Sequence, residues 1–167
     1  MRIISVFCLL TLLVLVLANK ALPSSLSEIE NIITKLDDKD YKFVSKISDK
    51  AWKVKYNLSD SEYEFFVEVW PNSGDFETDL IYIFTFLKEY REITQSDLKE
   101  LSFFLKANTS SVERGFFSLF KTSGKWYLVY NITLRRSNFS SYIYQTTLLI
   151  GSLFTKVYKD IIKERKY

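Results

Sequence analysis

The chain of 167 residues carries 23 basic and 20 acidic side chains, and a net charge of only +3 argues against nucleic acid as the main partner. It has no histidine, which argues against serine hydrolases with a histidine base, histidine-ligated zinc enzymes and haem proteins. Its one cysteine, Cys8, lies in an N-terminal apolar run, so we expect no disulfide, no metal site, no cofactor and no cysteine nucleophile in the mature protein.

The N-terminal segment, residues 1–18, is typical of a secretory signal peptide. Arg2 precedes an apolar run from Ile3 to Ala18, and the small residue Ala18 offers a cleavage point. The run has sixteen residues, whereas a helix that crosses a membrane needs roughly 20. We therefore expect cleavage after Ala18 and a secreted or cell-surface protein. The alternative is an uncleaved anchor, which would tether the protein to a membrane.

Residues 19–167 have the length of one domain, and this domain is expected to begin with an amphipathic helix. Ser25 and Glu28 match a capping box, in which a serine and a glutamate three residues later satisfy free backbone N–H groups. Apolar residues then follow at spacings of three and four, which predicts a helix that ends near Asp38.

From Tyr41 the apolar period changes to two, which predicts antiparallel strands separated by short polar turns. These strands cover residues 41–46, 52–58 and 64–70. After a turn at residues 71–75, residues 80–87 are apolar on both faces apart from Thr85. This pattern predicts a central strand covered by a helix.

The second half of the chain is expected to contain two further helices and one hairpin. A helix begins around residues 94–96, with Ser96 and Glu100 at its entry. Its buried face is predicted to consist of Leu98, Leu101, Phe104 and Leu105. Strands over residues 115–120 and 126–134 are joined by a turn in which Gly124 takes a positive φ. The last helix begins near Asn138, and its apolar face is predicted to contain Phe139, Ile143, Ile150, Leu153, Phe154, Val157 and Ile161.

The predicted order is α-β-β-β-β-α-β-β-α. Strands joined by hairpins and interrupted by helices indicate the α+β class, with an antiparallel sheet and helices packed on one face.

This order resembles the YbjN-like family and the type III secretion chaperone-like fold to which it belongs. The resemblance rests on the helix end at Leu105–Asn108, the strand start at Gly115–Phe117, the strand at Lys125–Tyr130 and the long C-terminal helix. It implies a single α+β domain over residues 19–167 that binds polypeptide partners or dimerises, with no catalytic residues to transfer. Domains of this kind are usually cytoplasmic, so the N-terminal segment is a departure from the family.

Four asparagines match the acceptor pattern for N-glycosylation. They are Asn57, Asn108, Asn131 and Asn138. Asn131 is expected to be exposed, because it falls on the strand face opposite to Trp126, Leu128 and Tyr130.

The three tryptophans divide into core and surface. Trp52 and Trp126 follow the apolar alternation and are predicted to lie in the core. Trp70 is out of phase with Val67 and Val69, so it is the candidate contact residue for a partner.

Two groups of charged residues invite a functional interpretation. Carboxylates cluster at residues 37–40 and at Glu62, Glu64 and Glu68, and such pairs serve as acid and base in hydrolases or bind calcium; a solvated turn and strand face is the favoured interpretation. Lysines gather on the polar faces of the first two strands, where they could meet an acidic surface or keep a sheet edge soluble. These lysines are Lys42, Lys46, Lys53 and Lys55.

The leading hypothesis is therefore an exported, non-catalytic module that binds a protein partner or a second copy of itself. The alternatives are a carboxylate-dependent hydrolase or glycan-acting enzyme, and a membrane-tethered surface protein. An enzyme requires a concave pocket in which two carboxylates converge, whereas a binding module shows an apolar patch or a symmetric interface.

Overall fold

The computed structural model describes residues 25–72, 75–108 and 115–164. The predicted signal peptide, residues 1–18, and its alternative as an anchor lie outside the described residues. Within the described ranges, no helix combines the length and the apolar character needed to cross a membrane.

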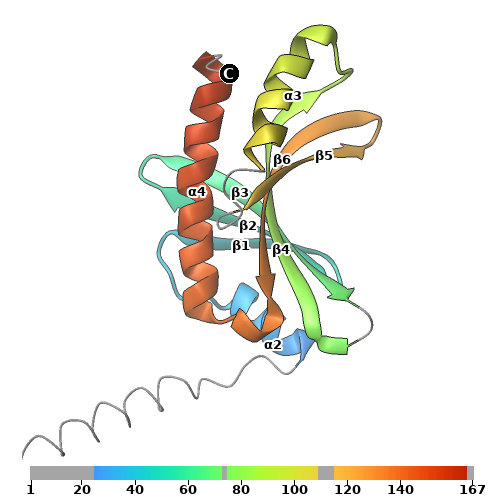
Figure 1. The fold of residues 1–167 in the computed structure, drawn as a ribbon. Helices are drawn as coiled ribbons and strands as arrows, with labels where there is room; N and C mark the ends of the chain where they lie inside the picture. The colour runs from blue at the N-terminus through green and yellow to red at the C-terminus, as the bar shows by residue number, and fades with distance from the viewer. Residues whose placement is uncertain (1–24, 73–74, 109–114, 165–167) are drawn as a thin grey trace, which may run out of the picture.

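A six-stranded antiparallel sheet in the order β1-β2-β3-β4-β6-β5 forms the centre of the fold (Figure 1). Its strands are β1 (Tyr41–Ser48), β2 (Ala51–Leu58), β3 (Ser61–Asn72), β4 (Asp75–Tyr90), β5 (Phe116–Thr122) and β6 (Lys125–Arg135). β3 and β4 extend beyond the predicted strands because Asn72 pairs with Asp75, which carries the ladder into polar residues without apolar alternation. Ser123 and Gly124 turn the β5–β6 hairpin with φ values of 50° and 76°, as predicted for Gly124.

Three α-helices and one short 3₁₀ helix complete the part of the fold that the structure describes, and these α-helices pack on one face of the sheet (Figure 1). They are α2 (Leu26–Thr34), α3 (Gln95–Ala107), η2 (Arg136–Asn138) and α4 (Ser141–Glu164). The predicted α+β class, element order and one-sided packing are confirmed.

Hydrogen bonds of polar side chains set the helix ends. The predicted capping box of Ser25 and Glu28 is present. α2 ends at Thr34, not near Asp38, because the Asp38 carboxylate accepts the Asp40 backbone N–H at 2.9 Å and turns the chain toward β1. Similarly, the Asp97 carboxylate, not Glu100, accepts the backbone N–H of the residue that caps α3, at 2.9 Å.

The core consists of two clusters beneath the helices. α2 and the first half of α4 cover one cluster, which includes Ile29, Ile33, Trp52, Val54, Phe65, Tyr144 and Leu148. The second cluster lies between α3, β4, β5, β6 and the second half of α4, and it includes Leu101, Phe104, Phe117, Leu128 and Tyr130. Trp52 is a core residue, as predicted. Trp126 is only partly buried: it packs against the edge of the second cluster, and Lys121 Nζ lies 5.2 Å from its ring centroid.

The predicted apolar face of α4 is wrong in part. Its buried positions include Tyr144 and Leu148 together with four small residues, Thr147, Gly151, Ser152 and Thr155. A Cβ atom at Gly151 would lie 3.1 Å from the Phe65 ring, so a small residue is what lets α4 approach β3. The larger residues at Ile150, Leu153 and Val157 consequently face outward.

The predicted buried face of α3 is also wrong in part. Leu98 and Leu105 are exposed, whereas Glu100 is buried. The Glu100 carboxylate accepts two contacts from Lys88 Nζ, at 2.9 and 3.0 Å, and the Tyr90 hydroxyl donates to it. This ion pair fastens α3 to β4, so a charged residue is buried at a position outside the predicted apolar face.

Candidate functional site

The face of the sheet opposite the α-helices, called the open face here, carries a band of aromatic side chains. In β3, Phe66 and Trp70 alternate with the core positions and therefore point to the open face. The same alternation places one apolar side of β4, which was predicted to be a central strand covered by a helix, on the open face. The band consists of Phe66, Trp70, Tyr82, Phe84, Phe86 and Tyr127, all on the described strands.

Neighbouring rings of this band contact one another across the strands. Phe66 and Phe84 are paired in register and stack with their centroids 5.3 Å apart. The rings of Trp70 and Tyr82 lie 5.6 Å apart. Such contacts hold the rings in place and give the open face two adjacent aromatic groups.

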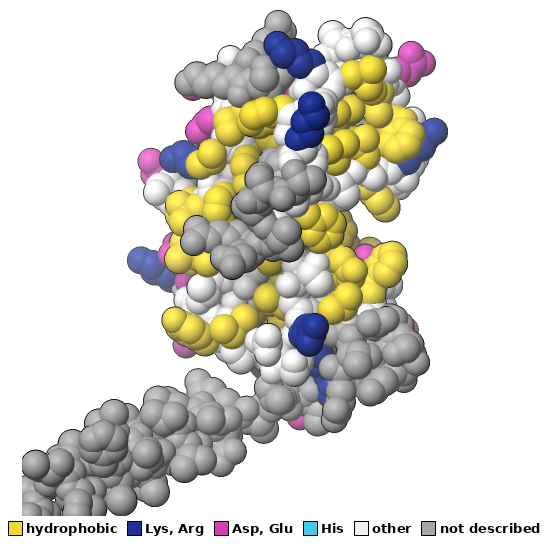
Figure 2. Space-filling model, viewed as in Figure 1, with side chains coloured by type: hydrophobic (Ala, Val, Ile, Leu, Met, Phe, Trp, Pro, Cys, Tyr) yellow, Lys and Arg dark blue, Asp and Glu magenta, His cyan; other side chains and the backbone are white. Residues whose placement is uncertain are grey.

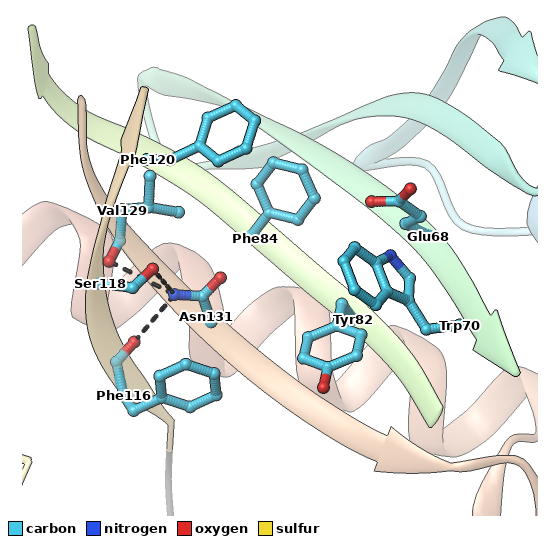
Figure 3. Close-up of a pocket in the computed structure, with 9 residues that line it drawn as sticks. All are labelled: Glu68, Trp70, Tyr82, Phe84, Phe116, Ser118, Phe120, Val129 and Asn131. Carbon is cyan, nitrogen blue, oxygen red and sulfur yellow. Dashed lines mark hydrogen bonds between the residues drawn. The ribbon is translucent and has the colours of Figure 1, made fainter. Parts of the chain in front are cut away.

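Part of the open face is hollowed between β3, β4, β6 and the edge strand β5 (Figure 3). We call this depression the open-face hollow; its volume is about 350 Å³. It is lined by Glu68, Trp70, Tyr82, Phe84, Phe116, Ser118, Phe120, Val129 and Asn131. The side chains of Trp70 and Phe120 are about half exposed, at 55% and 49%, so the walls are open to a ligand.

The floor of the hollow contains a buried amide. The Asn131 amide nitrogen donates to Ser118 Oγ at 2.9 Å and to the Phe116 carbonyl at 3.3 Å (Figure 3). The predicted strand face of Asn131 is correct, but its predicted exposure is wrong, because β5 pairs beside it and leaves only 8% of the residue exposed. The amide therefore serves the β5–β6 pair in the folded protein, and glycosylation of Asn131 stays a prediction.

The other glycosylation candidates differ in their surroundings. Asn57 and Asn138 are exposed. Asn108 is half-buried, and its amide makes two hydrogen bonds with the Phe117 backbone, at 2.6 and 2.8 Å. Glycosylation of these residues stays a prediction.

Glu68 is the one carboxylate among the described residues that line the hollow. It forms no ion pair among the side chains that the structure describes. By contrast, Glu64 lies 2.8 Å from Lys53 Nζ, and Glu62 pairs with Lys55. The predicted acidic strand face therefore separates into two neutralised carboxylates and one that carries its charge into the hollow.

Several of the remaining charged candidates have structural partners. Lys46 pairs with Glu30 of α2 at 3.0 Å, so three of the four strand lysines are neutralised. Asp38 accepts a hydrogen bond from Gln145 Nε2 of α4 at 2.9 Å. Burial, followed by the charge of Asp38, raises the pKa of Tyr56 to about 12. Among the described residues, no group of three or more acidic, cysteine or histidine side chains could hold a metal ion.

Trp70 is exposed at the rim of the hollow, so the predicted surface position is confirmed, and its contact with a partner stays a prediction. The sequence interpretation missed Tyr82, Phe84, Phe116 and Phe120 as lining residues. The signal that could have found them was the apolar character of both faces of β4. This pattern fits a strand covered by a helix, but it fits equally a strand that leaves one apolar face uncovered.

No protein-family model matches the chain, and no curated protein matches it either. Its structure is similar to the crystal structure of YbjN from E. coli, a protein described as a proposed transcription regulator, with a TM-score of 0.52 and 14% sequence identity. The similarity covers 87% of this chain and 96% of the YbjN chain. The predicted YbjN-like fold is confirmed at the level of the fold.

Proposed function

We propose that this protein is an exported, non-catalytic binding module that takes up an apolar segment of a protein partner on its open face. The observation that carries this proposal is the aromatic hollow on a sheet face that no helix covers in the described chain. Contiguous apolar surface of this kind commonly marks an interaction site. Trp70 and Tyr82 belong to the residue types that contribute most to binding at protein interfaces.

The charge distribution favours binding over hydrolysis. An acid and base pair requires two carboxylates that converge on one cavity. The hollow has Glu68, while Glu62 and Glu64 are engaged by lysines on β2. We therefore infer that the module acts without a catalytic pair, and that the hydrolase alternative is the weaker one.

Self-association through α4 is the second candidate. Five apolar residues lie on the outward side of this helix and form what we call the α4 outer row (Figure 2 shows hydrophobic side chains along the flank where α4 lies). They are Tyr142, Leu149, Ile150, Leu153 and Val157. At 1.5 Å per residue the row is about 22 Å long, which is the scale of a helix-to-helix dimer contact.

Export is supported by Arg2 and the apolar run from Ile3 to Ala18, as in a signal peptide. N-terminal sequencing of the native protein should find Asn19 as the first residue. Detection of Met1 or Arg2 on a membrane-bound protein would instead favour the tethered alternative.

Peptide binding distinguishes the open face from the α4 outer row as the binding surface. A blocked nonapeptide with leucine and phenylalanine at alternate positions should bind the purified protein, and W70A should weaken this binding at least tenfold in calorimetry. The matched control L153S, on the α4 outer row, should not change it. If the native protein fails to bind the peptide while L153S abolishes a dimer in sedimentation, the α4 candidate replaces the proposal.

A further inference from the structure

We propose that the open-face hollow takes a basic side chain of the bound segment, held by the Glu68 carboxylate and the rings of Trp70 and Tyr82. This inference rests on the proposed function, because it specifies the chemistry of the polypeptide that the open face receives. The partner would carry a lysine or arginine two residues from an apolar side chain.

The three side chains are neighbours on the open face. Glu68 and Tyr82 are directly opposite in the β3–β4 register, so their Cβ atoms are about 5 Å apart. Trp70 follows Glu68 by two residues on the same strand, and its ring centroid lies 5.6 Å from that of Tyr82. Figure 3 shows the Glu68 carboxylate and both rings on the same side of β3 and β4.

The charge of Glu68 is available to a ligand. The nearby Lys53 is already 2.8 Å from Glu64 and lies 5.7 Å from the Phe66 ring centroid. Lys50 lines a neighbouring depression together with Glu68, yet the described side chains of these two residues form no ion pair. A half-buried carboxylate beside apolar rings favours a cation from the ligand, because water reaches it on fewer sides than on a flat surface.

The rings beside Glu68 favour the same ligand. A cation is attracted to the face of tryptophan or tyrosine within about 6 Å of the ring centroid. Lysine and arginine also bring apolar stems that pack on aromatic surface while the charged end reaches the carboxylate. An anionic side chain would be repelled by Glu68, so the site discriminates by charge.

The spacing of Tyr82 and Phe84 in the hollow indicates which kind of ligand residue accompanies the basic side chain. Tyr82 and Phe84 are two residues apart on β4 and point to the same face. In an extended ligand, side chains two residues apart also share a face at nearly the same spacing. A basic side chain over Tyr82 therefore places the next same-face side chain over Phe84, where apolar walls receive it.

Three blocked peptides test this assignment. Each contains one phenylalanine and, two positions before it, a test residue that is lysine, glutamine or glutamate, with serine and glycine elsewhere. Binding is followed by the NMR shift of the Trp70 indole N–H, which W70F identifies. We expect the lysine peptide to bind at least tenfold more tightly than the glutamine peptide, and the glutamate peptide to bind least tightly.

Two charge-neutral variants provide the control. E68Q should weaken binding of the lysine peptide to the level of the glutamine peptide. The matched variant E64Q removes a carboxylate on the same strand and face that already has a lysine partner, so it should preserve the tenfold preference. Circular dichroism of both variants checks that the fold is retained.

The outcomes separate this inference from the proposed function. Equal affinity for the lysine and glutamine peptides would overturn the proposal that the hollow binds a basic side chain. A preference for the lysine peptide that persists in E68Q would do the same. Either result leaves the open face as an apolar binding surface. If none of the three peptides binds and the alternating nonapeptide also fails, the proposed function is overturned with it.

Discussion

Replacement of Asn131 tests whether its buried amide connects the edge strand β5 to the sheet. N131A removes the hydrogen bonds at 2.9 Å to Ser118 Oγ and at 3.3 Å to the Phe116 carbonyl. At about 1 kcal/mol of net stability for each neutral bond, the free energy of unfolding should fall by about 2 kcal/mol. N131D should cost about 1 to 2 kcal/mol more at neutral pH, because its carboxylate would face the Phe116 carbonyl oxygen, which cannot donate a hydrogen bond, in a poorly hydrated floor.

The additional cost of N131D should depend on pH in a defined direction. Burial and the carbonyl oxygens of Phe116 and Val129 favour the protonated acid, so the pKa of the introduced carboxyl is raised in the folded state above its unfolded value of about 3.9. The folded state then binds the proton more tightly, and the stabilisation by that proton is present below the unfolded pKa and is lost as pH rises through the folded pKa. Above that window N131D should be the less stable variant, and below it N131D should approach N131A.

Urea denaturation at pH 7.5 and pH 4 measures these differences, with the native protein as the reference at each pH. If N131D and N131A have the same free energy of unfolding at pH 7.5, the assignment of the amide as a donor to β5 is refuted. It is also refuted if the difference between the two variants does not become smaller at pH 4. The serine partner offers a control, since S118A should cost less than N131A because the Phe116 contact survives.

Three further predictions concern the rest of the fold. K88M should lower the free energy of unfolding by about 3 kcal/mol, because it leaves the buried Glu100 without its cation. The double variant K88M/E100L should be more stable than K88M in urea denaturation. If K88M is the more stable of the two, the lost ion pair is not the cause of its destabilisation. F104A, at a fully buried position of α3, should cost about 3 to 5 kcal/mol, whereas W70A should change stability by less than about 1 kcal/mol, and thermal unfolding of both compares core with surface. If the native protein is glycosylated, glycopeptide mass spectrometry should find glycans on Asn57 and Asn138 but not on Asn131; a glycan on Asn131 of the folded protein would contradict its burial.

The order of elements was predictable because local patterns determine it. The Ser25–Glu28 capping box and the positive φ at Gly124 each depend on a few adjacent residues. The two-residue alternation of β2 and β3 likewise identified Trp52 as core and Trp70 as surface. The candidate contact residue was therefore accessible to sequence reasoning, although the hollow around it was not.

Helix faces were less predictable, because the residue that packs best is not always the most apolar one. At Gly151 a close approach to Phe65 selects a small residue, and bulky neighbours turn outward. At Glu100 a lysine and a tyrosine from β4 stabilise a buried charge that periodicity assigns to the surface. Both cases depend on side chains that are distant in the sequence.

By itself the sequence determined the α+β class, the strand and helix order, and the side of the sheet on which the residues of β2 and β3 lie, since all of these follow from backbone periodicity and local capping. Only the tertiary structure decided which side of the sheet the α-helices leave open and which side chains meet there. Trp70 and Tyr82 come from paired strands, and β6 crosses back between β4 and β5 to complete the hollow. Strand pairing across long stretches of chain brings these groups together, so no local pattern contains the site.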